Sequence, residues 1–251
     1  MRRSGGQLAL VSAAGAVLLI WPLLAGSSAP LAVVSGAVVA LVLVTVAVET
    51  ATRRLDARQL ALLATIAAID SALRLLFVEG IGGWSPIFFL ILAAGYVYGP
   101  SFGFVCGTTA LLVSAVVTGG IGPWLPYEAL GCGWIGVAAG LAGMRRSGAV
   151  RTRDLVVLAV VGAVTGLLYG ALTDLQDWIT FYRGTPAFGW QPGLSSAELA
   201  RHFAVFYVTT SLVWDLFRSV GNALAVLLLG LPVLAALVRY RQRFSVIVLP
   251  G

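Results

Sequence analysis

The sequence predicts an all-α integral membrane protein with eight membrane-spanning segments. Its mean hydropathy is +0.98. Of its residues, 59% are hydrophobic, whereas about 45–50% is usual in soluble domains. Only 10% are charged, and these cluster between apolar runs that mostly reach the length of about 20 residues that a spanning helix needs. The bilayer is therefore the solvent for most of the surface.

Four apolar segments fill the first half of the chain. The first two are joined by a short polar link, and Pro30 suits the start of the second helix. The fourth segment is too short to cross comfortably unless it begins near Trp84. The four spans are expected at Leu8–Ala25, Pro30–Val48, Gln59–Val78 and Ile87–Tyr98.

Two loops stand out in the second half of the chain. Pro123 and Pro126 interrupt regular structure over Gly119–Glu128, because proline fixes φ and donates no hydrogen bond. A longer polar and aromatic loop covers Thr173–Ser196. Both loops follow odd-numbered segments, so they are expected on the same side of the membrane.

Four more segments complete the chain. Ser195 and Glu198 have capping-box spacing, so a helix is expected to begin there and to continue into the last segment. This segment is longer than one span requires, and Gly221 and Pro232 are the expected places of a kink. The four spans are expected at Gly99–Val117, Tyr127–Gly143, Leu155–Leu172 and from Ser195 to just before Arg239.

The arginines decide the orientation. The chain has no lysine, and its net charge of +6 comes from 16 arginines set against 10 acids. With the N-terminus inside, most arginines fall in inner loops or ends, as the positive-inside rule requires. The sequence therefore predicts both termini in the cytoplasm, which explains the basic charge better than nucleic-acid binding does. The inner arginines are Arg2, Arg3, Arg53, Arg54, Arg58, Arg145, Arg146, Arg151, Arg153, Arg239, Arg241 and Arg243.

Small residues recur every four positions on three segments. This spacing places each set on one helix face, where small side chains let another helix approach closely. We expect the glycine sets to pack inside the bundle. The alanine set directly follows an arginine-rich stretch at the cytoplasmic side, so docking of a partner helix and internal packing fit it equally well. The sets are Ala64, Ala68 and Ala72; Gly99, Gly103 and Gly107; and Gly162, Gly166 and Gly170.

Charged residues inside membrane segments are costly and are therefore functional candidates. Asp70 and Arg74 lie four positions apart on one face and are expected to form an ion pair. A second group shares one face of the last segment: Asp215, Arg218 and Asn222, with Trp214 beside them. Two interpretations remain open, namely self-neutralising pairs that hold helices together and the polar floor of a pocket open to the outside.

Aromatic residues gather on the predicted outer side, whereas the inner interface carries only Tyr98 and Tyr240. An aromatic belt would occupy both interfaces, so this asymmetry favours a binding chamber for a bulky organic ligand. Glu128 stands where the outer loop enters the membrane. The outer aromatic residues are Trp84, Trp124, Tyr127, Trp178, Phe181, Tyr182, Phe188 and Trp190. The candidate substrate-binding residues are Arg74, Trp84, Trp124, Tyr127, Glu128, Asp174, Asp177, Trp178, Tyr182, Trp190, Trp214, Asp215, Arg218 and Asn222.

The common catalytic and cofactor motifs are absent from the sequence. It contains no HExxH, no GxSxG and no phosphate loop with a lysine. The single histidine, His202, cannot build a histidine-based metal site, and Cys106 and Cys132 lie in apolar runs where cysteine packs as a small hydrophobe. We therefore expect no enzyme activity, no cofactor and no metal. Any active transport must take its energy from a partner or an ion gradient.

Four features occur together between Arg58 and Arg243. They are the alanine stripe, the turn at Tyr98-Gly99-Pro100, the stretch GGIGPWLPYEALGCGWIGVAAG at Gly119–Gly140, and the long outer loop before the last helix. In this combination the chain resembles the substrate-binding S components of energy-coupling factor (ECF) vitamin transporters in bacteria. The Gly119–Gly140 stretch is most similar to the cobalamin-type S components.

The resemblance implies a six-helix substrate-binding membrane domain at residues 53–251, preceded by an additional pair of transmembrane helices at residues 1–52. It implies capture of a vitamin, best matched by cobalamin or a related corrinoid, at the extracellular face of a bacterial cell membrane. A transmembrane coupling protein and two ATPase subunits would deliver it inward, and the alanine stripe would dock on the coupling protein. An ion-coupled secondary transporter, with Asp70, Asp215 or Glu128 as carrier, and a membrane enzyme acting on a lipid-linked substrate remain as alternatives.

Overall fold

The computed structural model describes residues 2–25, 33, 36–37, 40, 57–76, 84–146 and 148–242. The regular elements in these ranges are helices. Most of the expected segment Pro30–Val48 and most of the loop Glu79–Ser85 lie outside the described residues. The helices are α1 (Arg2–Ala25), α3 (Ala57–Leu76), α4 (Ile87–Tyr98), α5 (Pro100–Thr118), α6 (Leu125–Gly143), α7 (Thr152–Thr180), α8 (Ser196–Phe206), the π-helical η1 (Tyr207–Ser211) and α9 (Leu212–Gln242).

Three helical runs in the described part of the chain are long and apolar enough to cross a membrane. They are α5, α7 and the continuous run of α8, η1 and α9 over Ser196–Gln242. α1 and α4 supply the shorter apolar stretches Leu8–Ile20 and Ile87–Tyr98. These lengths agree with the all-helical membrane protein that the sequence predicts.

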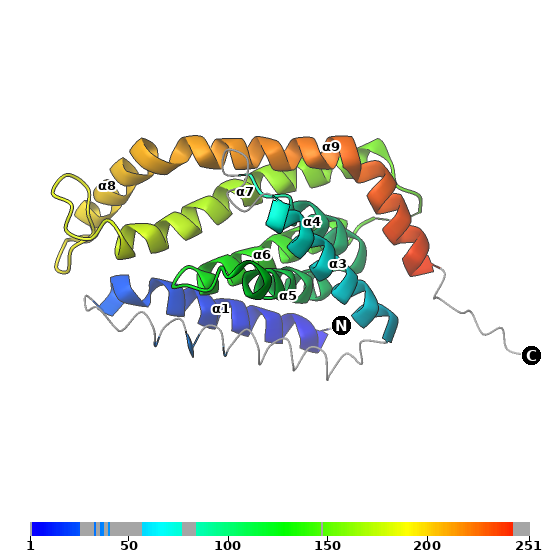
Figure 1. Cartoon of the computed structure of the whole chain (residues 1–251), viewed down its shortest axis with the longest axis horizontal. Coiled ribbons are helices and arrows are strands. Elements are labelled where there is room, and N and C mark those ends of the chain that lie inside the picture. The colour runs from blue at the N-terminus through cyan, green and yellow to red at the C-terminus, as the bar shows by residue number, and fades with distance from the viewer. Residues whose placement is uncertain are drawn as a thin grey trace, which may run out of the picture.

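α4, α5 and α6 form the centre of the molecule (Figure 1). α7 and α9 run side by side along one flank, α3 packs on α5, and α1 lies on the opposite flank against α6. α1 begins and α9 ends at the same end of the molecule, whereas α8 lies at the other end (Figure 1). Under the predicted topology, the end at which α1 begins and α9 ends is the cytoplasmic end, and the end with α8 is the outer end.

Glycines bring the three central helices into backbone contact. A Cβ atom at Gly136 of α6 would overlap the backbone carbonyl of Gly103 in α5, and one at Gly95 of α4 would overlap that of Gly136. Gly107 lies against the α6 backbone in the same way. Gly103 and Gly107 therefore pack inside the bundle, as expected. Gly99 has a different role, because its φ of 96° forms the turn between α4 and α5.

Several helices extend beyond the expected spans, and two of these differences change the bounds of the expected outer loops. α6 begins at Leu125, because a proline in the first helical turn removes no needed hydrogen bond and Pro126 therefore belongs to the helix. α7 continues to Thr180, so the loop expected over Thr173–Ser196 is limited to the residues between Thr180 and Ser196. The apolar span of α7 ends earlier, but the polar residues that follow continue the helix beyond it.

The last helical run departs from α-helical geometry at η1 rather than at Gly221, which was one of the two expected kink sites. The hydroxyls of Thr209 and Thr210, two neighbouring residues of η1, donate to the carbonyl oxygens of Val205 and Phe206, at 2.7 and 2.6 Å, and bonds of this kind often bend a helix. Pro232, the other expected site, lies inside α9, whose C-terminal part bends away from α7 (Figure 1). The capping box of Ser195 and Glu198 is confirmed at the start of α8.

α1 is attached to α6 by a buried hydrogen bond. The Tyr127 hydroxyl donates to the carbonyl oxygen of Leu19 at 2.9 Å, and the side chain of Leu130 packs onto Gly15. Tyr127 is 1% exposed, so its ring belongs to the contact between these helices. One of the candidate substrate-binding residues thus holds the N-terminal helix in place.

Replacing Tyr127 by phenylalanine should loosen α1 without unfolding the bundle. Loss of one hydrogen bond costs about 0.5–1.5 kcal/mol, so hydrogen–deuterium exchange within residues 2–25 should increase severalfold. Tyr98→Phe is the matched control, because the Tyr98 hydroxyl donates to the carbonyl of Leu237 in α9 and not to α1. Equal exchange of α1 in both variants would contradict this attachment.

Candidate functional site

The glycine face of α7 accommodates the polar face of α9. Gly170 lies directly against the carboxyl group of Asp215, where a Cβ atom would overlap it. One turn along, Gly166 lies against Ser219, and the amide nitrogen of Asn222 donates to the carbonyl oxygen of Gly162 at 3.2 Å. The glycine set therefore packs internally, as expected, and what it packs against is the polar group of the last helix.

Asp215 is the centre of a buried polar group near the outer end of α7 and α9. It is 1% exposed and forms an ion pair with Arg218, one turn further along α9. Asp174 of α7 lies beside Asp215 and Ser211, and Tyr207 lies beside Asp215 as well. The π-helical turn thus places two hydroxyl groups next to two carboxyl groups. One oxygen of Asp215 and one of Asp174 are buried without a hydrogen-bond partner among the described residues.

A second ion pair joins α3 to α6. The Arg74 guanidinium lies 3.5 Å from a carboxylate oxygen of Glu128, and both side chains are mostly buried. Glu128 also interacts electrostatically with Asp177 and Arg218. The two ion pairs are therefore parts of one group of charges contributed by α3, α6, α7 and α9.

Tyr169 lies between the two ion pairs. The Arg218 guanidinium carbon is 5.5 Å from the centre of the Tyr169 ring, within the range of a cation–π contact. The ring of Phe88 meets Tyr169 edge-on, with 4.8 Å between ring centroids. Tyr169 also interacts electrostatically with Glu128 and Arg74. We define the outer charged cluster as Arg74, Glu128, Tyr169, Asp174, Asp177, Asp215 and Arg218.

The expected ion pair between Asp70 and Arg74 does not form. Arg74 reaches across to Glu128, whereas Asp70 is fully buried and its carboxylate oxygens have no hydrogen-bond partner among the described residues. Spacing of four places both residues on one face of α3, but a long arginine side chain can extend toward the outer end, where a second acid is available. Asp70 faces the interior, where it interacts electrostatically with Cys106 and Cys132.

Three candidate aromatic residues form the core of a cap at the outer end. Trp178 and Trp190 are 1% and 2% exposed. The Trp178 indole nitrogen donates to the carbonyl of Phe188 at 2.6 Å, and the Tyr182 ring packs on that of Phe206, with 4.8 Å between centroids. These rings hold the segment after α7 against α8, so their contacts are with one another.

The other three candidate tryptophans lie in different surroundings. Trp124 folds back over Gly122 in its own loop, and the ring of Trp84 packs against Gly221 of α9. Trp214 is 55% exposed on α9. Although Trp214 precedes Asp215 in sequence, one step around a helix turns its side chain by about 100°, away from the polar face. None of the three belongs to the outer charged cluster.

Residues 59–230 match the family model described as ECF transporter, substrate-specific component, and this range covers well over half of the chain. The chain belongs to this family. S components are transporter subunits rather than enzymes; they bind a small substrate and work with a membrane coupling protein and ATPases. Comparisons with characterised proteins and with solved structures gave no match.

The S component exposes the alanine stripe of α3. Ala64, Ala68 and Ala72 are all exposed, whereas Leu63 and Ile66 on the other side of the helix are buried in a cluster with α5. Of the two interpretations of this stripe, docking of a partner helix fits an exposed face. Within the described part of the chain this face is open, and docking of a partner helix there stays a prediction.

Sequence reasoning missed three residues of the polar groups in this S component. Tyr169, Tyr207 and Ser211 lie beside the charged residues, but none is charged or stands in a distinctive motif. A usable signal exists for Tyr169, which directly precedes Gly170 in the glycine stripe. None exists for Tyr207 and Ser211, because the π-helical turn shifts their direction relative to an α-helix.

Proposed function

We propose that this S component captures a vitamin at the extracellular face of a bacterial cell membrane, with cobalamin or a related corrinoid as the first candidate. A coupling protein and two ATPase subunits then deliver the vitamin inward. The observation that carries the proposal is the outer charged cluster, which gathers charges from four helices at the outer end of a membrane domain. Such charges are costly in a membrane and mark substrate pathways.

The composition of the cluster bears on the substrate. Four acids face only two arginines, and two carboxylate oxygens are buried without partners among the described residues. Such a site favours a ligand with many N–H donors or a positive charge, because unpaired buried acceptors are costly. The primary amide groups around a corrin ring supply such donors. The rings of the aromatic cap are buried against one another, so the charges of the cluster and not the cap support this choice of ligand.

Purified full-length protein should bind cobalamin stoichiometrically, as measured by the absorbance of the corrinoid that remains with the protein after gel filtration. Cobinamide and a panel of other water-soluble vitamins, tested by the shift in thermal unfolding temperature, would identify the substrate if cobalamin is not retained. If none of the tested compounds binds to the protein, the proposal is wrong. Uptake into vesicles that lack ATPases, abolished by an ionophore, would instead support an ion-coupled transporter.

Replacing Glu128 by glutamine should weaken substrate binding about 10-fold or more. A hydrogen bond to a charged group contributes about 1.5–3 kcal/mol, and the neutral amide keeps the shape of the side chain. The measurement is a binding isotherm for the retained vitamin. Glu198→Gln is the matched control, because Glu198 is an exposed outer acid whose capping role glutamine also fulfils. Equal affinities of the two variants would place Glu128 outside the site.

A further inference from the structure

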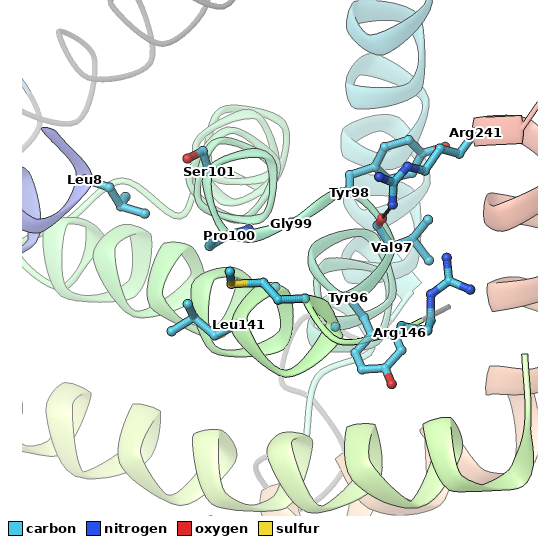
Figure 2. A pocket seen from close by; sticks show the side chains of 13 residues that line it. Leu8, Tyr96, Val97, Tyr98, Gly99, Pro100, Ser101, Leu141, Arg146 and Arg241 are labelled. Carbon is cyan, nitrogen blue, oxygen red and sulfur yellow. Dashed lines mark hydrogen bonds between the residues drawn. The ribbon is translucent and has the colours of Figure 1, made fainter. Parts of the chain in front are cut away.

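A second site lies at the opposite end of the molecule from the outer charged cluster. An open cavity of about 440 Å³ is bordered by the turn between α4 and α5, the end of α6 and the end of α9. Its size is within the range of about 300–1,000 Å³ that is usual for small-molecule sites. Figure 2 shows Arg146 and Arg241 on one side of the cavity, and Leu8 and Leu141 on the other.

The basic side of the cavity can hold an oxyanion. The Arg241 guanidinium donates to the carbonyl oxygen of Val97 at 2.6 Å, and that of Arg146 donates to the carbonyl of Gly148 at 3.0 Å. Each guanidinium carries five N–H donors in a planar fork, so one bond to a backbone carbonyl leaves other donors able to bind a phosphate. The first turn of α5, at Pro100, also lines the cavity, and a helix N-terminus favours negative charge.

The other side of the cavity is apolar and reaches the surface. Pro100, Leu141 and Met144 line it together with Leu8 of α1. Leu141 and Met144 are 57% and 60% exposed, so the apolar wall of the cavity continues onto the exposed side of the helix bundle. The cavity therefore joins a cationic end to an apolar slot at the level where α4 and α6 end and α5 begins.

We propose that this cavity binds an anionic phospholipid of the inner leaflet, with the phosphate on Arg146 and Arg241 and an acyl chain along Leu141 and Met144. An amphiphile with an acidic head satisfies both halves of the cavity, whereas a soluble anion would leave the apolar wall without a partner. Basic pockets between transmembrane helices at the cytoplasmic side suit acidic lipid head groups. The site lies far from the outer charged cluster and does not depend on the identity of the transported substrate.

Native mass spectrometry measures the preference of the full chain for an anionic lipid. The protein is released from nanodiscs that contain equal amounts of phosphatidylglycerol and phosphatidylcholine with identical acyl chains. The protein should retain phosphatidylglycerol over phosphatidylcholine by about tenfold, since each arginine near the surface attracts anionic lipid. The double variant R146Q/R241Q should lose the preference. Leu141→Trp should lower retention of both lipids by filling the slot without changing the charge. Inorganic phosphate at millimolar concentration should not displace the lipid.

The matched control is R153Q/R239Q, which removes two exposed arginines from the same end of α7 and α9 without touching the cavity. This control should keep the preference, and thermal unfolding should show that all variants are folded. Equal retention of the two lipids by the unmodified chain would overturn the proposal, as would an equal loss in the control. If the R146Q/R241Q variant keeps its lipids but no longer binds the coupling protein, the cavity is a protein-docking site and the proposal is wrong.

Discussion

Gly136→Ala is expected to abolish or severely reduce the folded yield of this S component. A Cβ atom at this position would overlap the backbone carbonyl of Gly103, and backbone atoms cannot move aside as a side chain can. α5 and α6 would have to separate along their whole contact. Overpacking in cores costs about 1–3 kcal/mol where side chains can adjust, so the expected cost here is at the top of this range or above it. A fall of about 10 °C in the unfolding temperature would correspond to about 3 kcal/mol.

Gly6→Ala is the matched control for this prediction. Gly6 also lies inside a helix, but no atom lies within 4 Å of the position that its Cβ would occupy. Alanine is a better helix former than glycine by about 1 kcal/mol, so this variant should be as stable as the unmodified protein or slightly more stable. The thermal stability of both variants is measured by fluorescence-detected gel filtration after heating. A Gly136→Ala protein as stable as the control would show that the central helices do not rely on backbone contact.

Much of the helical arrangement could be predicted because the underlying signals lie within single segments. Apolar length places α4 at Ile87–Tyr98, as the structure has it, and Ser195 with Glu198 marks the start of α8. Spacing of four predicts that the Gly162, Gly166 and Gly170 face packs internally. Each of these inferences needs only the geometry of one helix.

The candidate site was harder to predict because its contacts join different helices. Spacing pairs Asp70 with Arg74 on one helix, but the structure pairs Arg74 with Glu128, 54 positions away. The sequence cannot reveal which acid lies across a helix contact. The same difficulty applies to Trp178 and Trp190, whose aromatic character fits a ligand wall and a folded cap equally well.

Glycine serves two different purposes in this molecule. At Gly103 and Gly136 it removes side chains so that backbones touch, which gives a rigid centre. At Gly170 and Gly166 it makes room for polar side chains of α9, so that Asp215 can remain in a membrane domain. The rigid centre lies between the outer charged cluster and the cytoplasmic end. Because these backbone contacts resist sliding of one central helix past another, we expect a change at the outer charged cluster to reach the cytoplasmic end as a movement of whole helices.

Ala68→Trp is expected to abolish ATP-dependent uptake and leave substrate binding intact. Ala68 is exposed at the centre of the alanine face of α3, so an indole ring there should not disturb the fold. It would hold a docking helix of the coupling protein away from the α3 backbone, and a loss of more than about 1.4 kcal/mol lowers affinity more than tenfold. Two measurements separate the steps: vitamin binding by the purified S component, and co-purification with the coupling protein.

Ile69→Trp is the control that makes this experiment specific. Ile69 is 45% exposed on the same helix. Because it follows Ala68 by one residue, its side chain points about 100° away from that of Ala68. The added ring should then meet lipid and leave both binding and uptake unchanged. Loss of uptake in both variants would indicate a general effect of a bulky residue on α3. Normal uptake in Ala68→Trp would mean that the coupling protein docks elsewhere, because a helix cannot approach closely over an indole ring.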